Sequence, residues 1–183
     1  MKVTLLGISP EIWRRFLFPG NSKLEQVHES IQIAFGWQNC HLHEFEIVGQ
    51  RYGDPDNPLD SDFISERATK CKLKFLNLKP GDTFIYRYDF GDDWTHEIEI
   101  EDLLPPDPNG YYPDCIAGAR ACPPEDCGGI PGYQNLLEAV ADAGHPDHDQ
   151  LLNWAGGDFD PENFDLKEAH SCIGSMLMMM TLS

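Results

Sequence analysis

A short segment rich in cysteine, proline and glycine carries the densest set of reactive side chains in this sequence. Three of the six cysteines, Cys115, Cys122 and Cys127, fall within it, and Glu125 and Asp126 stand between the last two. Neither a helical nor a strand pattern requires that composition. We therefore expect a metal, a disulfide or a tight backbone arrangement around the carboxylates to hold this segment. The residues alone leave all three open.

The spacing of these cysteines bears on zinc. A structural zinc site needs four ligands and commonly takes two of them from cysteines separated by two residues. No such pair exists here. Thiolates nevertheless prefer borderline or soft ions, and a histidine could complete the set. We predict that any metal is zinc, held by Cys115, Cys122, Cys127 and His96, and the simpler alternative is that the cysteines pack as small hydrophobic residues or form a disulfide.

Glu125 and Asp126 follow two prolines and precede two glycines. Adjacent side chains of an extended chain point in different directions, so we predict that these two carboxylates do not act as a pair. We expect them to fix the turn or to cap the helix that begins near Gly132.

Histidines and aspartates form a second group of ligand-type residues. His41 and His43 are two residues apart, which places both on one face of a strand. Asp89, Asp92 and His96 surround one turn. Imidazoles and carboxylates at close range suit a divalent metal or general acid–base chemistry. The alternatives are hydrogen-bonded core histidines and aspartates that serve only the turn.

The clearest positioning element is a hairpin formed by residues 83–90 and 94–101. Apolar and acidic residues alternate along its second strand, which predicts one buried and one exposed face. A two-residue turn at 91–92 fits the glycine there. That register places four side chains together on the core side: Arg87, Asp89, Trp94 and His96.

We predict that these groups meet at one concave site around His43, Asp89, His96 and the loop 122–127. The candidate polar site as a whole comprises His41, His43, Arg87, Asp89, Asp92, Trp94, His96, Glu125 and Asp126.

The N-terminal part is predicted to supply strands and one helix. Residues 2–6 and 11–18 favour strands. A capping box at 22–25 opens a helix whose apolar residues recur at helical spacing until Gly36 ends it. Residues 50–70 are polar and are expected to form a loop.

Helices dominate the C-terminal part. Residues 103–131 are predicted to be a loop. One helix then ends near Gly144, a second runs from about Asp147 to Trp154, and a capping box at Asp165 opens a third.

Because strands mostly precede helices, we predict an α+β fold, an antiparallel sheet packed with helices in a single compact domain. It would comprise a sheet-rich part at 1–104, the cysteine, proline and glycine loop at 105–131, and a helical part at 132–183.

Charge and composition limit the classes of molecule that this protein is expected to bind. The 183-residue chain has a formal net charge of −18, and residues 105–183 hold thirteen acidic but only two basic residues. Phosphate repulsion therefore argues against direct binding to duplex nucleic acid and to an anionic membrane surface. The chain has no apolar run long enough to span a membrane and no signal peptide, so we expect a cytoplasmic protein with free or metal-bound cysteines.

Five ordered motifs resemble the plasmid Ri open-reading-frame-three-like family. They are residues 12–15 (IWRR), 31–37 (IQIAFGW), 41–45 (HLHEF), 88–94 (YDFGDDW) with His96, and 122–129 (CPPEDCGG). The resemblance runs from about Val3 to Asp165. It implies a single α+β domain of unknown reaction, found on plasmids and mobile elements as well as on chromosomes.

Three functional hypotheses remain. A non-enzymatic binding or accessory module, with an unknown protein or small-molecule partner, is favoured because the common catalytic motifs are missing. A metal-dependent hydrolase or nuclease-like enzyme would use the histidine and aspartate group. An acidic accessory protein in mobile-element recombination is suggested by charge and by the company of relatives.

Overall fold

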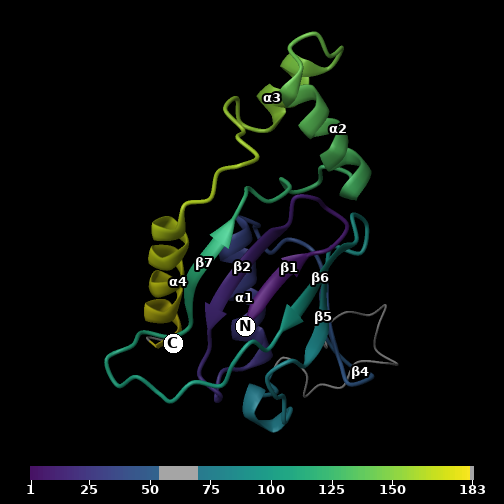
Figure 1. Ribbon diagram of the computed structural model, residues 1–183. Helices are drawn as coiled ribbons and strands as arrows, with labels where there is room; N and C mark the ends of the chain where they lie inside the picture. The colour runs from purple at the N-terminus through teal and green to yellow at the C-terminus, as the bar shows by residue number, and fades with distance from the viewer. Residues whose placement is uncertain (54–69, 182–183) are drawn as a thin grey trace.

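Seven antiparallel strands form one central sheet (Figure 1). This computed structural model describes residues 1–53 and 70–181, with side chains to residue 176. The strand order is β4-β3-β5-β6-β1-β2-β7. The strands are β1 (Lys2–Leu5), β2 (Ile12–Leu17), β3 (His43–Ile47), β4 (Gln50–Gly53), β5 (Thr83–Tyr88), β6 (Trp94–Glu99) and β7 (Asp114–Ala119).

Four α-helices and one short 3-10 helix accompany the sheet among the described residues. They are α1 (Leu24–Phe35), η1 (Leu73–Phe75), α2 (Gly129–Ala141), α3 (His148–Trp154) and α4 (Leu166–Thr181). In Figure 1, α4 runs alongside β7, whereas α2 and α3 extend beyond one end of the sheet. The predicted α+β class with an antiparallel sheet is thereby confirmed.

The core lies between α1 and one face of the sheet. Strand side chains alternate, so every second residue of β5 and β6 points inward. Val27 and Ile31 of α1 and Tyr86 and His96 of the strands are all fully buried. The opposite face carries charged residues such as Glu97, as expected for an antiparallel sheet with one solvated face.

Helix α1 begins one residue later than predicted. Its N-cap is Lys23, whose backbone N–H donates to Oε1 of Gln26 at 2.9 Å. The predicted box used Ser22, but that residue is buried beside the helix start. Gly36 ends the helix as predicted, in the left-handed conformation with φ 78°.

Two predicted loops contain strands. Strand β7 lies inside the predicted loop 103–131 and pairs with the edge of β2. Small residues conceal it in sequence, because Gly118 is close to Arg14 and Phe164 and leaves no room for a larger side chain. Strand β4 begins the predicted loop 50–70, of which residues 54–69 lie outside the described part of the chain.

The predicted hairpin register was wrong by one residue. Tyr88 pairs with Trp94 and Tyr86 with His96, so residues 89–93 all belong to the turn. Asp89 and Asp93 make this longer turn feasible with φ 54° and 56°, because aspartate tolerates the left-handed region. A slip of one residue turns a side chain to the other face of a sheet. Arg87 therefore lies on the face opposite His96.

Among the described residues, no helix is both long and apolar enough to cross a membrane.

Candidate functional site

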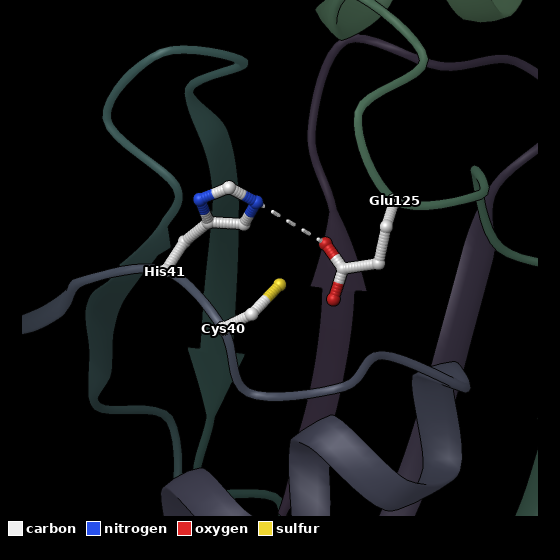
Figure 2. A group of neighbouring side chains, drawn as sticks. All are labelled: Cys40, His41 and Glu125. Atoms are coloured by element: carbon white, nitrogen blue, oxygen red, sulfur yellow. Dashed lines mark ion pairs between the residues drawn. The ribbon is translucent and has the colours of Figure 1, made fainter.

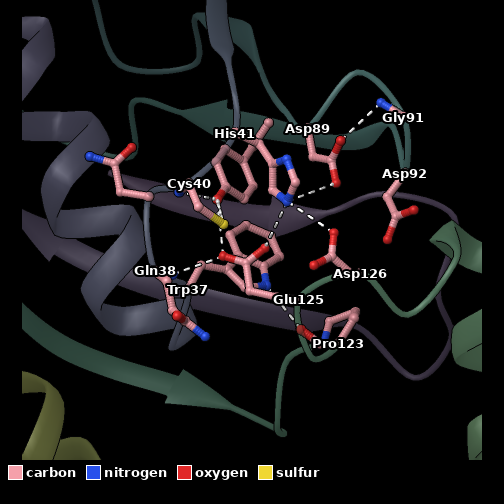
Figure 3. Close-up of polar contacts among 12 residues, drawn as sticks. Trp37, Gln38, Cys40, His41, Asp89, Gly91, Asp92, Pro123, Glu125 and Asp126 are labelled. Carbon is pink, nitrogen blue, oxygen red and sulfur yellow. Dashed lines mark hydrogen bonds and ion pairs between the residues drawn. The ribbon is translucent and has the colours of Figure 1, made fainter.

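Three carboxylates from two separate segments converge on one imidazole nitrogen. Nε2 of His41 lies 3.0 Å from Oδ1 of Asp126, 3.7 Å from Oδ2 of Asp89 and 3.8 Å from Oε2 of Glu125. Figure 3 shows these groups pointing at one another from the α1–β3 segment, the β5–β6 turn and the loop before α2. We call His41, Asp89, Glu125 and Asp126 the His41 cluster.

Local backbone geometry delivers the two aspartates. The N–H of Asp89 donates to the carbonyl of Leu42 at 2.9 Å, which joins the turn to the residue after His41. Asp126 has φ 56°, and this left-handed residue turns the chain so that its carboxylate faces the same nitrogen as that of Glu125. The prediction that Glu125 and Asp126 point apart assumed an extended chain and was wrong.

A buried arginine and a tryptophan hold the loop before α2 in place. Arg14 donates to the carbonyls of Ala119 and Arg120, each at 2.8 Å, and to Sγ of Cys122 at 3.0 Å. Nε1 of Trp37 donates to the carbonyl of Pro123 at 2.9 Å. The backbone on both sides of Cys122 is thus fixed before the chain reaches the two carboxylates.

The two buried carboxylates divide their oxygens between support and site. Oε1 of Glu125 accepts the backbone N–H of Gln38 at 2.8 Å and the hydroxyl of Tyr88 at 2.9 Å. Oδ1 of Asp89 accepts the N–H of Gly91 at 2.9 Å. Their other oxygens, Oε2 and Oδ2, face His41. Hydrogen bonds from outside thus orient each carboxylate so that one oxygen points inward.

The inward atoms lack ordinary partners. Nε2 of His41 and Oε2 of Glu125 are buried without a hydrogen bond to any described residue, and the 3.0 Å contact to Asp126 lacks hydrogen-bond alignment. The side chains of Asp89 and Glu125 are each 10% exposed, whereas those of His41 and Asp126 are 30% and 72% exposed. The cluster is therefore buried on one side and open to solvent at Asp126.

The shortest of these separations equals the spacing of two ligand atoms around a metal ion, and the other two are slightly wider. Two ligand atoms each about 2.1 Å from one ion lie about 3.0 Å apart at a right angle and about 3.4 Å apart at the tetrahedral angle. Two sets of ligand atoms fall within 4.8 Å of one another among the described residues: His41, Asp89 and Asp126, and Cys40, His41 and Glu125. Figure 2 shows the second set.

The other predicted histidines belong to the core. His43 is the first residue of β3 and stacks on His28 with ring centroids 3.5 Å apart, and burial lowers the pKa of His43 to about 3. His96 is fully buried against Phe35 and Trp37, and burial likewise lowers its pKa to about 3. Both rings lie on the core face of the sheet, but neither belongs to a ligand set among the described residues, so the polar groups do not assemble around His43 and His96 as predicted.

The remaining predicted polar residues have structural partners. Arg87 pairs with Glu44 at 2.9 Å and with Asp93 at 3.0 Å on the other face of the sheet. Oδ2 of Asp92 accepts the N–H of Gly128, the residue before α2, so Asp92 helps to fix the turn that Glu125 and Asp126 were predicted to fix. Trp94 is buried beside Trp37 in the core.

The predicted cysteine ligands do not form a group with His96 in the described part of the chain. Cys115 lies on β7 with Sγ toward the carbonyl of Ala117, Cys122 contacts Arg14, and Sγ of Cys127 points to the carbonyl of Gly129. Burial raises the pKa of Cys115 to about 11 and those of Cys122 and Cys127 to about 12, which favours the thiols over thiolates.

Sequence reasoning missed two residues of this site. Cys40 was passed over because it lies outside the cysteine-rich segment, although its position directly before His41 was a usable signal. Tyr88 was treated as a strand residue, and nothing in its pattern indicates that its hydroxyl reaches a loop 37 positions away.

The fold and site define an α+β domain with a carboxylate-rich histidine cluster at one end of an antiparallel sheet. The chain belongs to the plasmid pRiA4b ORF-3-like protein family, whose model matches residues 1–168. This membership confirms the resemblance drawn from the five motifs.

Two relatives support the assignment. The chain is 35% identical over 177 residues to the uncharacterized protein y4hQ of Sinorhizobium fredii, covering 96% of this chain and 90% of that protein. It is also similar to the crystal structure of MM3350, a protein of unknown function from Methanosarcina mazei Go1. That match has a TM-score of 0.80 and 38% identity over 91% of this chain and 94% of the other. Neither relative carries an established reaction in its description.

Proposed function

We propose that this protein is a binding domain for a divalent metal ion, held by side chains of the His41 cluster. The observation that carries the proposal is the division of oxygens in Asp89 and Glu125. One oxygen of each carboxylate accepts hydrogen bonds from the surrounding protein, and the other is directed toward Nε2 of His41. Proteins orient metal-binding carboxylates in this way.

Charge supports a cation as the ligand. Three carboxylates surround one imidazole, and no lysine or arginine among the described residues forms an ion pair with any of the three. Even a protonated His41 would leave two negative charges in excess. A divalent ion would neutralise that excess, because bound cations are the strongest local charges in such sites. The exposed side of Asp126 gives the ion a path from solvent.

The test is a metal titration of protein purified without chelator and without a metal-affinity tag. Isothermal titration with Zn²⁺ and with Mn²⁺ should give about one ion per chain. Glu125→Gln should weaken Zn²⁺ binding strongly. Its amide oxygen can still accept from Gln38 and Tyr88, but its NH₂ group would then face the ion.

Asp114→Asn is the matched control. Asp114 also contacts an imidazole, that of His170 at 2.6 Å, but as a single carboxylate on an exposed part of β7 and α4. This variant should bind the ion as the wild type does. Absence of binding by the wild type, or equal Zn²⁺ affinities for Glu125→Gln and the wild type, would refute the proposal.

One observation favours metal-dependent hydrolysis as a second candidate. Asp126 is 72% exposed, so a bound ion would have a side accessible to water and substrate. A metal at such a site can lower the pKa of bound water and supply a nucleophile. Release of nitrophenol from an activated phosphodiester by the metal-loaded protein, lost in Glu125→Gln, would support this candidate. A metal-loaded protein with no activity above free ions would leave the binding role alone.

A further inference from the structure

We infer that Cys40 is a metal ligand and that the site offers two overlapping ligand sets. One set is Cys40, His41 and Glu125, which would take a thiophilic ion such as zinc or cobalt. The other is His41, Asp89 and Asp126, which would take a harder ion such as manganese. This inference rests on the proposed function and specifies the class of ion at each set.

The geometry places the thiol of Cys40 at the cluster. Its Sγ lies within 4.8 Å of ligand atoms of both His41 and Glu125. Figure 2 shows the sulfur directed toward the space between the imidazole and the carboxylate. A second observation points to a ligand at this set. The Glu125 side chain is only 10% exposed, and its Oε2 has no hydrogen bond to any described residue.

One hydroxyl holds both ends of this set. The backbone N–H of Cys40 donates to the hydroxyl oxygen of Tyr88 at 3.2 Å, and that hydroxyl donates to Oε1 of Glu125 at 2.9 Å. Sγ of Cys40 is 3.9 Å from the hydroxyl oxygen of Tyr88. Tyr88 therefore fixes the backbone that presents the thiol and the carboxylate that faces it.

Cys40 differs from the three cysteines of the predicted zinc site. It is exposed, whereas Cys115 and Cys122 are buried and Cys127 is half-buried. Solvent access lets an arriving ion reach its sulfur, which burial of the other three thiols hinders. Cys172 is also exposed, but it lies on α4 and belongs to neither ligand set.

Ligand softness distinguishes the two sets. Thiolate selects zinc and cobalt over manganese, whereas carboxylates and imidazole accept harder ions. Because both sets depend on His41, we expect one ion per chain, whose identity decides which side chains move inward. The outcome would be a site whose occupant responds to the supply of different metals.

Cobalt absorption tests the inference directly. The wild-type protein is titrated with Co²⁺, alongside Cys40→Ser and the control Cys172→Ser. The wild type and Cys172→Ser should develop a thiolate-to-cobalt charge-transfer band in the near ultraviolet that saturates at about one equivalent. Cys40→Ser should lose that band and bind Zn²⁺ at least about tenfold more weakly, since even second-shell changes cost 10–100-fold. Its Mn²⁺ affinity should stay within about twofold of the wild type.

The outcomes separate the two proposals. If the wild type binds Co²⁺ without a charge-transfer band, or if Cys40→Ser keeps the band, Cys40 is not a ligand, although the domain still binds metal. If the wild type binds neither Co²⁺ nor Mn²⁺, the inference and the proposed function both fail. Native circular dichroism of Cys40→Ser confirms folding, which an exposed cysteine-to-serine change should not disturb.

Discussion

The hydroxyl of Tyr88 donates a hydrogen bond to Oε1 of Glu125 across 2.9 Å, joining the end of β5 to the loop before α2. Burial raises the pKa of Tyr88, and the hydrogen bond to Glu125 raises it further. The phenol therefore stays protonated and acts as a donor throughout the physiological range. Because Oε1 is engaged, Oε2 is the oxygen left to face His41.

Replacing Tyr88 with phenylalanine should weaken metal binding without unfolding the domain. The ring packing on Trp37 is retained, but Glu125 loses an orienting donor. We expect about a tenfold rise in the Kd for zinc and a loss of about 1 kcal/mol in stability. Tyr86→Phe is the control, because its hydroxyl contacts His28 and Gln32 in the core. It should lower stability and leave the Kd unchanged, and a similar rise in both variants would contradict the assigned role of Tyr88.

Substitution of Asp126 should lower metal affinity, whereas substitution of Asp92 should lower stability. Asp126→Asn keeps a residue that tolerates φ 56° and removes a negative charge from the cluster, so it should leave stability equal or higher while metal affinity falls. Asp92→Ala removes the acceptor for the N–H of Gly128 and should cost about 1 kcal/mol, the usual net contribution of one hydrogen bond. Urea denaturation and metal titration of each variant check this. A stability loss confined to Asp126→Asn would restore the capping role first predicted for Asp126.

Buried histidines should make the fold less stable in acid. His43 and His96 have folded pKa values of about 3, lowered mainly by burial. Below the ordinary histidine pKa of about 6.5, these histidines bind protons in the unfolded chain, but in the folded chain they bind protons only near pH 3. The free energy of unfolding therefore falls as the pH drops. Each histidine should remove about 2 kcal/mol between pH 7 and pH 5.

The variant His96→Leu removes the pH-dependent contribution of His96 to stability and leaves that of His43. Denaturation at pH 7 and pH 5 should show a drop about 2 kcal/mol smaller than in the wild type. The control variant His145→Asn alters a half-buried histidine that lies outside the core. Equal drops in the wild type and His96→Leu would mean that the folded chain protonates His96 freely.

Replacing either of two helical glycines with alanine should change stability in opposite directions. A Cβ at Gly132 in α2 would lie 1.8 Å from the carbonyl oxygen of Cys127, whereas one at Gly174 in α4 would meet no atom within 4 Å. Gly132→Ala should destabilise the protein by about 3 kcal/mol or more and loosen the neighbouring Asp126. Gly174→Ala should stabilise it by about 0.5–1 kcal/mol. Thermal unfolding of both variants decides, and a neutral Gly132→Ala would show that the loop before α2 can shift freely.

Local patterns were enough to predict most of the elements. The alternation in β5 and β6, the period of α1 and its stop at Gly36, and the capping box at Asp165 all depend on neighbours within a few residues. Asp165 indeed accepts the N–H groups of Lys167 and Glu168. Strand β7 was missed because its small residues satisfy a tertiary need, the close approach of Arg14 and Phe164, that no local pattern records.

The sequence by itself supplied the ligand types, the α+β class and the family, and it included His41, Asp89, Glu125 and Asp126 among the candidates. Only the tertiary structure decided which of them meet. The five-residue turn sent Arg87 to the other face, the left-handed Asp126 brought adjacent carboxylates together, and core packing removed His43 and His96 from the site. The physical reason is that register and backbone handedness change side-chain directions by half a turn, while the pattern of residue types that suggests them stays the same.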